Sequence, residues 1–210
     1  MLGKFSLVIA SLFFVASIAK ADPVTYTVTV DTSSITGTAG SLDFQFNPGP
    51  LTTQAASLQI LGFTSDGTLA GTPSLTGDVS GALPGTLTFD NGGGYNDYFD
   101  GFTYGTTLSF QVSLYGPALS SPDGLSTSGS TFAFSMFSDT NGTVPALTSD
   151  TTFGVAATVD VNFDGTTTAT DLSTYTSVAS PAAVPEPGSL VLLATGLLGI
   201  SGTLRRRLRG

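Results

Sequence analysis

Residues 24–30 read Val-Thr-Tyr-Thr-Val-Thr-Val, with every apolar side chain on one face and every threonine on the other. An alternation of period two is typical of a β-strand with one buried face. The pattern returns along the chain and predicts further strands at residues 42–46, 107–114, 131–137 and 153–163, and more weakly at residues 57–63, 74–79 and 85–89.

Turn-forming residues separate these strands, among them Asn47-Pro48-Gly49-Pro50 and Asp164-Gly165. Short strands joined by turns, with no amphipathic helix between them, predict an all-β fold. We expect an antiparallel β-sandwich of Ig-like or jelly-roll type over residues 22–178. A solenoid is the main alternative, but no fixed period of about 20 to 50 residues recurs.

Composition excludes several functional classes. The 210 residues include 15 acidic and 6 basic residues, a formal net charge of -9, and no histidine, cysteine or tryptophan. Catalytic triads, thiolate nucleophiles, disulfides and His or Cys metal sites are therefore excluded. No basic residue lies between Lys20 and Arg205. Nucleic acid is not expected as a partner, because its binding depends on Lys and Arg.

The N-terminus has the features of a secretory signal peptide. Lys4 precedes an apolar run at residues 5–18, and Ala19-Lys20-Ala21 forms an A-x-A cleavage site. We expect residues 1–21 to direct export through the Sec machinery and to be cleaved after Ala21. The alternative is an uncleaved membrane anchor, although the apolar run is shorter than the roughly 20 residues that a span needs.

The C-terminus carries a second signal. An extended segment over residues 175–184, with the linker proper at residues 179–184, leads to Pro185-Glu186-Pro187 and an apolar stretch at residues 189–204. As a helix this stretch would reach roughly 24 Å, against a hydrocarbon core of about 30 Å, so it predicts one marginal transmembrane helix. The chain then ends in a basic cluster of Arg205, Arg206, Arg207 and Arg209, which favours a cytoplasmic C-terminus.

This order of motif, helix and arginine cluster resembles the PEP-CTERM sorting signal of exported bacterial proteins. Val184, Pro185, Glu186 and Pro187 occupy the motif position, and residues 185–210 form the signal. The resemblance implies processing by an exosortase, an integral membrane cysteine protease or transpeptidase, in a Gram-negative bacterium that makes extracellular polysaccharide. It also implies a transient stage in the inner membrane before the protein reaches the cell surface or the medium. An ordinary tail anchor is the alternative.

One segment has the spacing of an EF-hand or dockerin-type calcium loop. Its candidate ligands are Asp160, Asn162, Asp164, Thr166 and Asp171, with Gly165 at the sharp turn. Calcium is the one cofactor that the sequence suggests. The flanking segments are not helical in pattern, however, and the alternative is a β-hairpin that turns at Asp164-Gly165.

A second candidate is the Gly-rich segment 90–104, where aspartates alternate with aromatic residues. It would bind a sugar or calcium, or else fold its aromatic residues into the core. Paired aspartates also serve glycoside hydrolases, but no pair stands out in the sequence. A flat ice-binding face would need a regular threonine array, which is missing.

We therefore predict an exported surface or extracellular-matrix protein with a non-enzymatic structural or binding role, with exopolysaccharide as the candidate partner. The alternative is a calcium-dependent adhesion or carbohydrate-binding module, and a glycoside hydrolase is a remote alternative.

Overall fold

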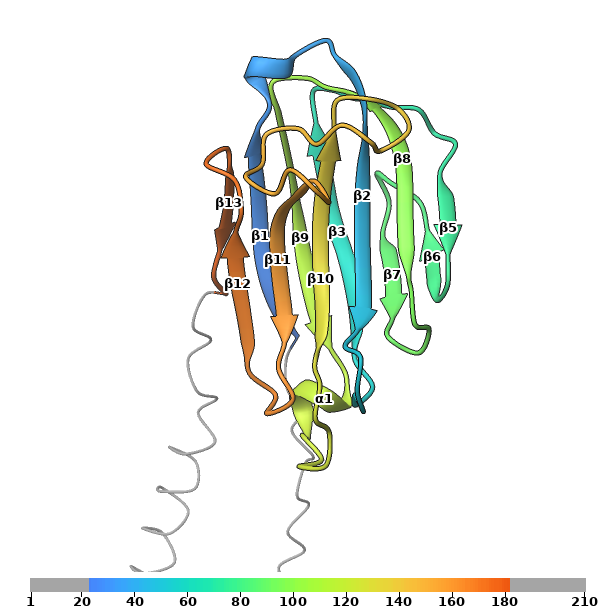
Figure 1. The fold of residues 1–210 in the computed structure, drawn as a ribbon, viewed down its shortest axis with the longest axis vertical. Coiled ribbons are helices and arrows are strands. Elements are labelled where there is room, and N and C mark those ends of the chain that lie inside the picture. The colour runs from blue at the N-terminus through green and yellow to red at the C-terminus, as the bar shows by residue number, and fades with distance from the viewer. Residues whose placement is uncertain (1–22, 182–210) are drawn as a thin grey trace, which may run out of the picture. The chain divides into compact units, whose positions relative to one another are not determined.

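The computed structural model describes residues 23–181, which form an all-β fold of two antiparallel sheets (Figure 1). In spatial order, the first sheet contains β13 (Thr176–Ala179), β1 (Val24–Asp31), β9 (Thr107–Tyr115), β3 (Ser57–Ser65), β7 (Leu87–Asp90) and β6 (Val79–Gly81). The second sheet contains β12 (Thr167–Asp171), β11 (Val155–Val161), β10 (Ser130–Phe137), β2 (Ala39–Pro48), β8 (Asp97–Thr103) and β4 (Thr68–Leu69), and β5 (Ser74–Thr76) also pairs with β8. The helical segments among these residues are a 3-10 helix at Ser33–Ile35 and α1 at Pro117–Ser120. The all-β prediction is confirmed, while the Ig-like or jelly-roll type stays a prediction.

The alternation of residues 24–30 has the predicted structural consequence. Strand β1 pairs with β9 in continuous antiparallel register, from Val24 opposite Leu114 to Asp31 opposite Thr107. Tyr26, Val28 and Val30 are buried, and the threonines between them are less buried. Because side chains of a strand point alternately to opposite faces, this register commits the apolar face of β1 to the core.

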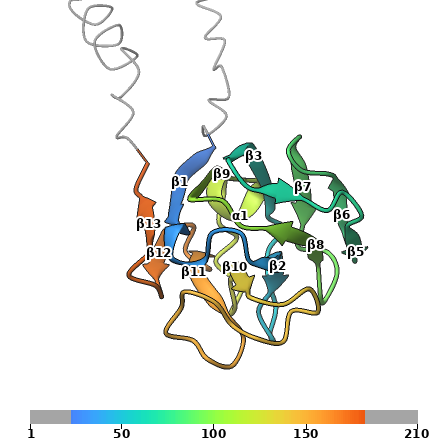
Figure 2. The same ribbon diagram turned by 90° about the horizontal axis from the view of Figure 1, so that it is seen from above.

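The core lies between the two sheets, which Figure 2 shows from above as two layers. Phe44 of β2 is fully buried, and its ring centroid lies 5.1 Å from that of Phe110 in β9, on the opposite sheet. Phe134 of β10 completes a group of three rings, 5.0 Å from each of the other two. Such tilted and edge-on contacts are the preferred aromatic geometry and stabilise the packing of one sheet on the other.

A buried asparagine also links the two sheets. Asn91 follows β7 and is 8% exposed. Its side-chain nitrogen donates to Ser130 Oγ, at the start of β10, over 2.8 Å and to the carbonyl oxygen of Gln54 over 2.9 Å. Its Oδ1 accepts the N–H of Ala56 over 2.9 Å. All polar groups of this amide are therefore paired, as burial requires.

The structure contains strands in segments for which none was predicted. Strand β8 lies within the Gly-rich segment 90–104, and β13 lies within the extended segment 175–184. Strand β12 follows the Asp164-Gly165 turn, as the hairpin alternative predicted. The predicted strand at residues 74–79 is divided into β5 and β6 at Gly77, whose φ of 75° interrupts the extended backbone.

The prediction that Phe153 and Phe163 belong to the buried face of one strand is wrong. Strand β11 covers only Val155–Val161, and the two rings are 72% and 60% exposed. Gly154, at φ 73°, ends the extended backbone before the strand, and the turn at Asn162 ends it after.

Several predictions fall outside the described residues. They concern the signal peptide with Ala19 and Ala21, the sorting motif, the C-terminal helix and the terminal arginines. Within residues 23–181, neither the length nor the hydropathy of any helix suffices for a membrane span. The compact unit that contains the strands ends at Ala179, and the predicted division of the chain at residues 21, 178 and 184 stays a prediction.

We expect Phe44→Ala to lower the free energy of unfolding by about 3–5 kcal/mol, because it leaves a cavity where three rings meet. Phe163→Ala is the matched control, since this ring is 60% exposed and its removal should change stability by no more than about 0.5 kcal/mol. Denaturant unfolding of both variants checks this. Equal losses in the two variants would show that the Phe44 contacts do not join the sheets.

Candidate functional site

The outer face of the second sheet carries a cluster of polar side chains. In β2, Phe44 faces the core, so its neighbours Asp43 and Gln45 face outward. In the register of β2 with β8, Gln45 lies opposite Asp97 and Asp43 lies opposite Phe99. The outward side chains of the two strands are therefore neighbours on one surface of the sheet.

Four residues make up this cluster, which we call the acidic cluster: Asp43, Gln45, Tyr95 and Asp97. Gln45 Nε2 donates to Asp43 Oδ2 over 2.8 Å and to Tyr95 Oη over 3.2 Å. Asp43 and Asp97 are each only 8% exposed, although they lie on the outward face. The Oδ1 atom of each is buried and accepts no N–H or O–H group.

The two carboxyl groups cannot both be charged without a large electrostatic cost. Burial raises the pKa of Asp43 to about 9, with further contributions from a hydrogen bond to Asp97 and from the charge of Asp97. Burial also raises the pKa of Tyr95 to about 12, and the charges of Asp97 and Asp43 act in the same direction. At neutral pH, the pair therefore holds one proton, which supplies the hydrogen bond that the two carboxyl groups otherwise lack.

A groove of about 340 Å³ lies beside the acidic cluster. Its lining includes Asp43 and Gln45 of β2, Ser135 of β10, and Thr152 and Phe153 of the loop over residues 138–154. In Figure 2 this loop lies on the outer side of β10 and β11. A Cβ on Gly142 would lie 2.8 Å from the Phe99 ring, so glycine permits the loop to contact the sheet at this position.

Exposed aromatic rings adjoin the groove. Phe153 is 72% exposed on the loop, and Tyr95 is 50% exposed beside Gln45. Aromatic faces next to carboxyl, amide and hydroxyl groups form a surface on which a hydroxyl-rich ligand can stack and hydrogen-bond.

Asp100 is a third buried carboxyl group, but it does not belong to the acidic cluster. It lies opposite Leu42 in the register, on the core face of β8, and is 1% exposed. Tyr98 Oη donates to its Oδ2 over 3.4 Å, and its Oδ1 has no partner. The sheet therefore separates Asp100 from Asp43 and Asp97.

The structure does not bring together the five residues of the predicted calcium loop. Asp160 and Asp171 lie on the paired strands β11 and β12, where Asp171 is opposite Ala157 and Asp160 is opposite Thr168. Asp171 is thus about 13 Å along its strand from the turn, at about 3.3 Å per residue. A single ion cannot contact both Asp171 and Asp164, and this segment does not form an EF-hand.

The hairpin alternative is confirmed, and its polar groups bond to one another. Asp164 Oδ1 accepts the N–H and the Oγ1–H of Thr166 over 3.0 and 2.6 Å. Asn162 Nδ2 donates to the hydroxyls of Thr166 and Thr168 over 3.0 and 3.1 Å. Across residues 23–181, moreover, no three Asp, Glu, His or Cys side chains form a group that could hold a metal ion.

The second predicted segment, residues 90–104, divides between the two interpretations. Tyr98, Phe102 and Tyr104 are buried in the core, as the structural alternative predicted. Tyr95 remains half exposed and Asp97 enters the acidic cluster.

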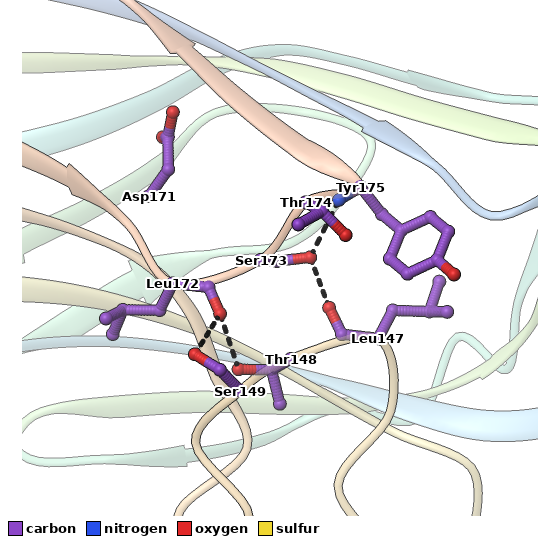
Figure 3. A pocket seen from close by; sticks show the side chains of 8 residues that line it. All are labelled: Leu147, Thr148, Ser149, Asp171, Leu172, Ser173, Thr174 and Tyr175. Atoms are coloured by element: carbon purple, nitrogen blue, oxygen red, sulfur yellow. Dashed lines mark hydrogen bonds between the residues drawn. The ribbon is translucent and has the colours of Figure 1, made fainter.

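A second pocket, of about 480 Å³, lies between residues 147–149 and the β12–β13 connection (Figure 3). Its hydroxyl groups bond to the backbone: Ser173 Oγ donates to Leu147 O, and Ser149 Oγ donates to Leu172 O over 2.8 Å. Asp171 points away from these groups in Figure 3, and its Oδ1 accepts the N–H of Val178 over 3.1 Å. These bonds hold two loops together and leave no buried polar atom of the lining without a partner.

Asp43 and Gln45 were not among the predicted site residues. Both occupy outward positions of an alternating strand, where a polar residue ordinarily indicates exposure to solvent. The burial of Asp43 and the half-burial of Gln45 depend on β8, Tyr95 and the loop over residues 138–154, which are distant in sequence. The short-range signal in the chain is Asp97 close to Tyr95, and these two residues are half of the cluster.

Comparison with known proteins adds one finding. The family model of the PEP-CTERM protein-sorting motif matches residues 183–207 of the chain. No curated protein matches the chain. No solved structure matches it either.

Asp43→Asn should remove a dependence of stability on pH. The folded-state pKa of Asp43, about 9, lies above the ordinary aspartate pKa of 3.8, so between these values the folded protein binds one proton more than the unfolded chain. The stability contributed by this group is complete below pH 4 and declines as pH rises toward 9, by up to about 1.4 kcal/mol per pH unit.

In Asp43→Asn the amide donates to Asp97 at every pH, so the variant should gain stability over the wild type as pH rises through this range. Thermal unfolding of the full chain in a chelator checks this. Asp164→Asn is the control, because the pKa of Asp164 is lowered by hydrogen bonds from Thr166 and its effect should be constant above about pH 5. Parallel pH profiles for Asp43→Asn and the wild type would contradict the prediction.

Proposed function

The chain carries a PEP-CTERM motif, which implies export to the cell envelope or surface with an exosortase as processing partner, and on this premise we propose that its β domain serves there as a non-enzymatic binding module. The observation that carries the proposal is the combination of this signal with the groove beside the acidic cluster. An exported protein meets polysaccharide at the cell surface, and the groove offers the chemistry that binds hydroxyl-rich chains.

The proposed ligand is an extracellular polysaccharide. Phe153 and Tyr95 would stack on sugar rings, while Gln45 and Thr152 would hydrogen-bond sugar hydroxyls. The precursor would enter through the Sec machinery, remain briefly in the inner membrane by its C-terminal helix, and then reach the surface or the medium after exosortase cleavage.

Calcium-dependent adhesion is the second candidate. It is supported by the two carboxyl groups of Asp43 and Asp97, whose Oδ1 atoms lack a donor. A glycoside hydrolase remains the remote alternative. Retaining enzymes separate their carboxyl groups by about 5 Å and inverting enzymes by more, whereas Asp43 and Asp97 are close enough to hydrogen-bond to each other.

Sorting can be tested by intact-mass analysis of the protein from membrane and medium fractions of native cells. We expect the wild-type protein in the medium to begin at Asp22 and to end near Pro185-Glu186-Pro187. Replacing Pro185 and Glu186 by alanine should retain the C-terminal residues and leave the protein in the membrane. A released wild-type protein that still contains the arginine cluster would contradict exosortase processing.

Polysaccharide binding can be tested with exopolysaccharide purified from the same cells. Loss of one stacking ring should weaken binding by about 2- to 10-fold, so we expect this from Phe153→Ala. Phe163→Ala is the matched control, because Phe163 is also an exposed phenylalanine and does not line the groove. Equal affinity of the wild type and both variants in sedimentation assays would reject the groove as the binding surface.

A further inference from the structure

The acidic cluster places two buried carboxyl groups side by side without a basic side chain. Asp43 and Asp97 are 8% exposed, and each directs a buried Oδ1 atom that has no donor into the cluster. No lysine, arginine or histidine lies between Lys20 and Arg205. A buried carboxylate is stable only when it is paired, hydrogen-bonded, bound to a metal or protonated.

The residues around the pair add no charge. Ser135 and Thr76 lie in register with Asp43 and Asp97 on the neighbouring strands β10 and β5. Gly142 and Thr152 of the covering loop are neutral as well, and Tyr95 is the other titratable group in contact with the pair. The described residues therefore provide carboxyl oxygens and no positively charged group at this point.

We propose that the acidic cluster is a binding site for a divalent cation, with calcium as the ligand, held between the carboxylates of Asp43 and Asp97. Neutral oxygens complete the ligand set. Tyr95 Oη lies within the cluster and is the neutral side-chain oxygen beside the pair, because Gln45 directs its Nε2 to Asp43 and Tyr95. The Oε1 of Gln45 accepts Asn47 Nδ2 over 3.2 Å. Waters fill the remaining positions, as is usual for calcium.

The carboxylate oxygens of Asp43 and Asp97, and the two negative charges that they carry when ionised, favour a hard divalent cation. Calcium and magnesium prefer carboxylate, amide and water oxygens, and two carboxylates neutralise a divalent ion. The ion reaches the cluster through the groove, because Asp43 and Gln45 line its wall.

The proposal differs from a calcium loop at the hairpin. The cation site proposed here lies on the paired strands β2 and β8 of the second sheet, which fix both carboxyl groups, and not in the segment Asp160–Asp171. It does not require that the protein bind polysaccharide, because metal binding and polysaccharide binding are measured separately.

Terbium luminescence tests the site, because Tb³⁺ takes calcium positions and is excited through a nearby tyrosine. The chain has 6 tyrosines and no tryptophan, and Tyr95 belongs to the cluster. The experiment uses the full-length chain in detergent, first treated with chelator and then titrated with Tb³⁺. We expect emission that calcium displaces.

Asp97→Asn and Asp43→Asn should each weaken Tb³⁺ binding by about tenfold or more, since even partners outside the ligand set change metal affinity by about 10–100-fold. Asp164→Asn is the matched control and should bind as the wild type does. Circular dichroism establishes that each variant is folded. If Asp97→Asn does not fold, Asp43→Asn keeps the test valid, because its amide can still donate to Asp97.

A second readout is the melting temperature, which a ligand that binds only the folded state raises by mass action. Millimolar calcium should raise the Tm of the wild type and of Asp164→Asn, with at most a small effect on Asp97→Asn. Wild-type protein that neither sensitises Tb³⁺ nor responds to calcium would overturn the proposal. Binding that survives in Asp43→Asn and Asp97→Asn but is lost in Asp164→Asn would also overturn it, in favour of the hairpin.

Discussion

The contact of Phe44 with Phe110 and Phe134 is the interaction on which the rest of the structure depends. It joins the two sheets at centroid distances of 5.0 to 5.1 Å, in a chain without cysteine. Because Phe44 must face the core, its neighbours in β2 must face outward. The packing of one ring therefore places Asp43 and Gln45 on the outer face, where β8 brings Asp97 beside them.

The aspartates of the β domain lie in two different environments. In neither can they form an ion pair with a residue between Lys20 and Arg205, because that segment has no basic residue. At exposed turns they accept hydrogen bonds. The side-chain and backbone donors of Thr106, with the N–H of Thr107, lower the pKa of Asp66 to about 2. In the acidic cluster burial acts in the opposite direction and raises the pKa of Asp43. An aspartate thus stabilises a turn in one place, and in another it belongs to a buried pair of carboxyl groups without a basic partner.

These features suit a protein that acts outside the cytoplasm. The sorting motif at residues 183–207 implies export, and the domain carries its acidic charge without any cation of its own. Like charge would repel acidic polymers at the cell surface, and a divalent cation at the acidic cluster would reduce that repulsion locally. The groove and the acidic cluster share Asp43 and Gln45, so the polysaccharide and the cation would bind on the same face of the second sheet.

The all-β class, the buried face of strands such as β1 and the sorting motif could be predicted from the sequence, because alternation and short motifs are local properties of the chain. The sequence left the acidic cluster undetermined. Asp43 has the pattern of a solvent-exposed strand position, and the calcium loop at Asp160–Asp171 has convincing spacing. Only the tertiary structure decided both, because strand pairing extends Asp171 away from the turn and places Asp97, from a distant segment, beside Asp43. Burial and charge pairing depend on contacts between segments, which no local pattern encodes.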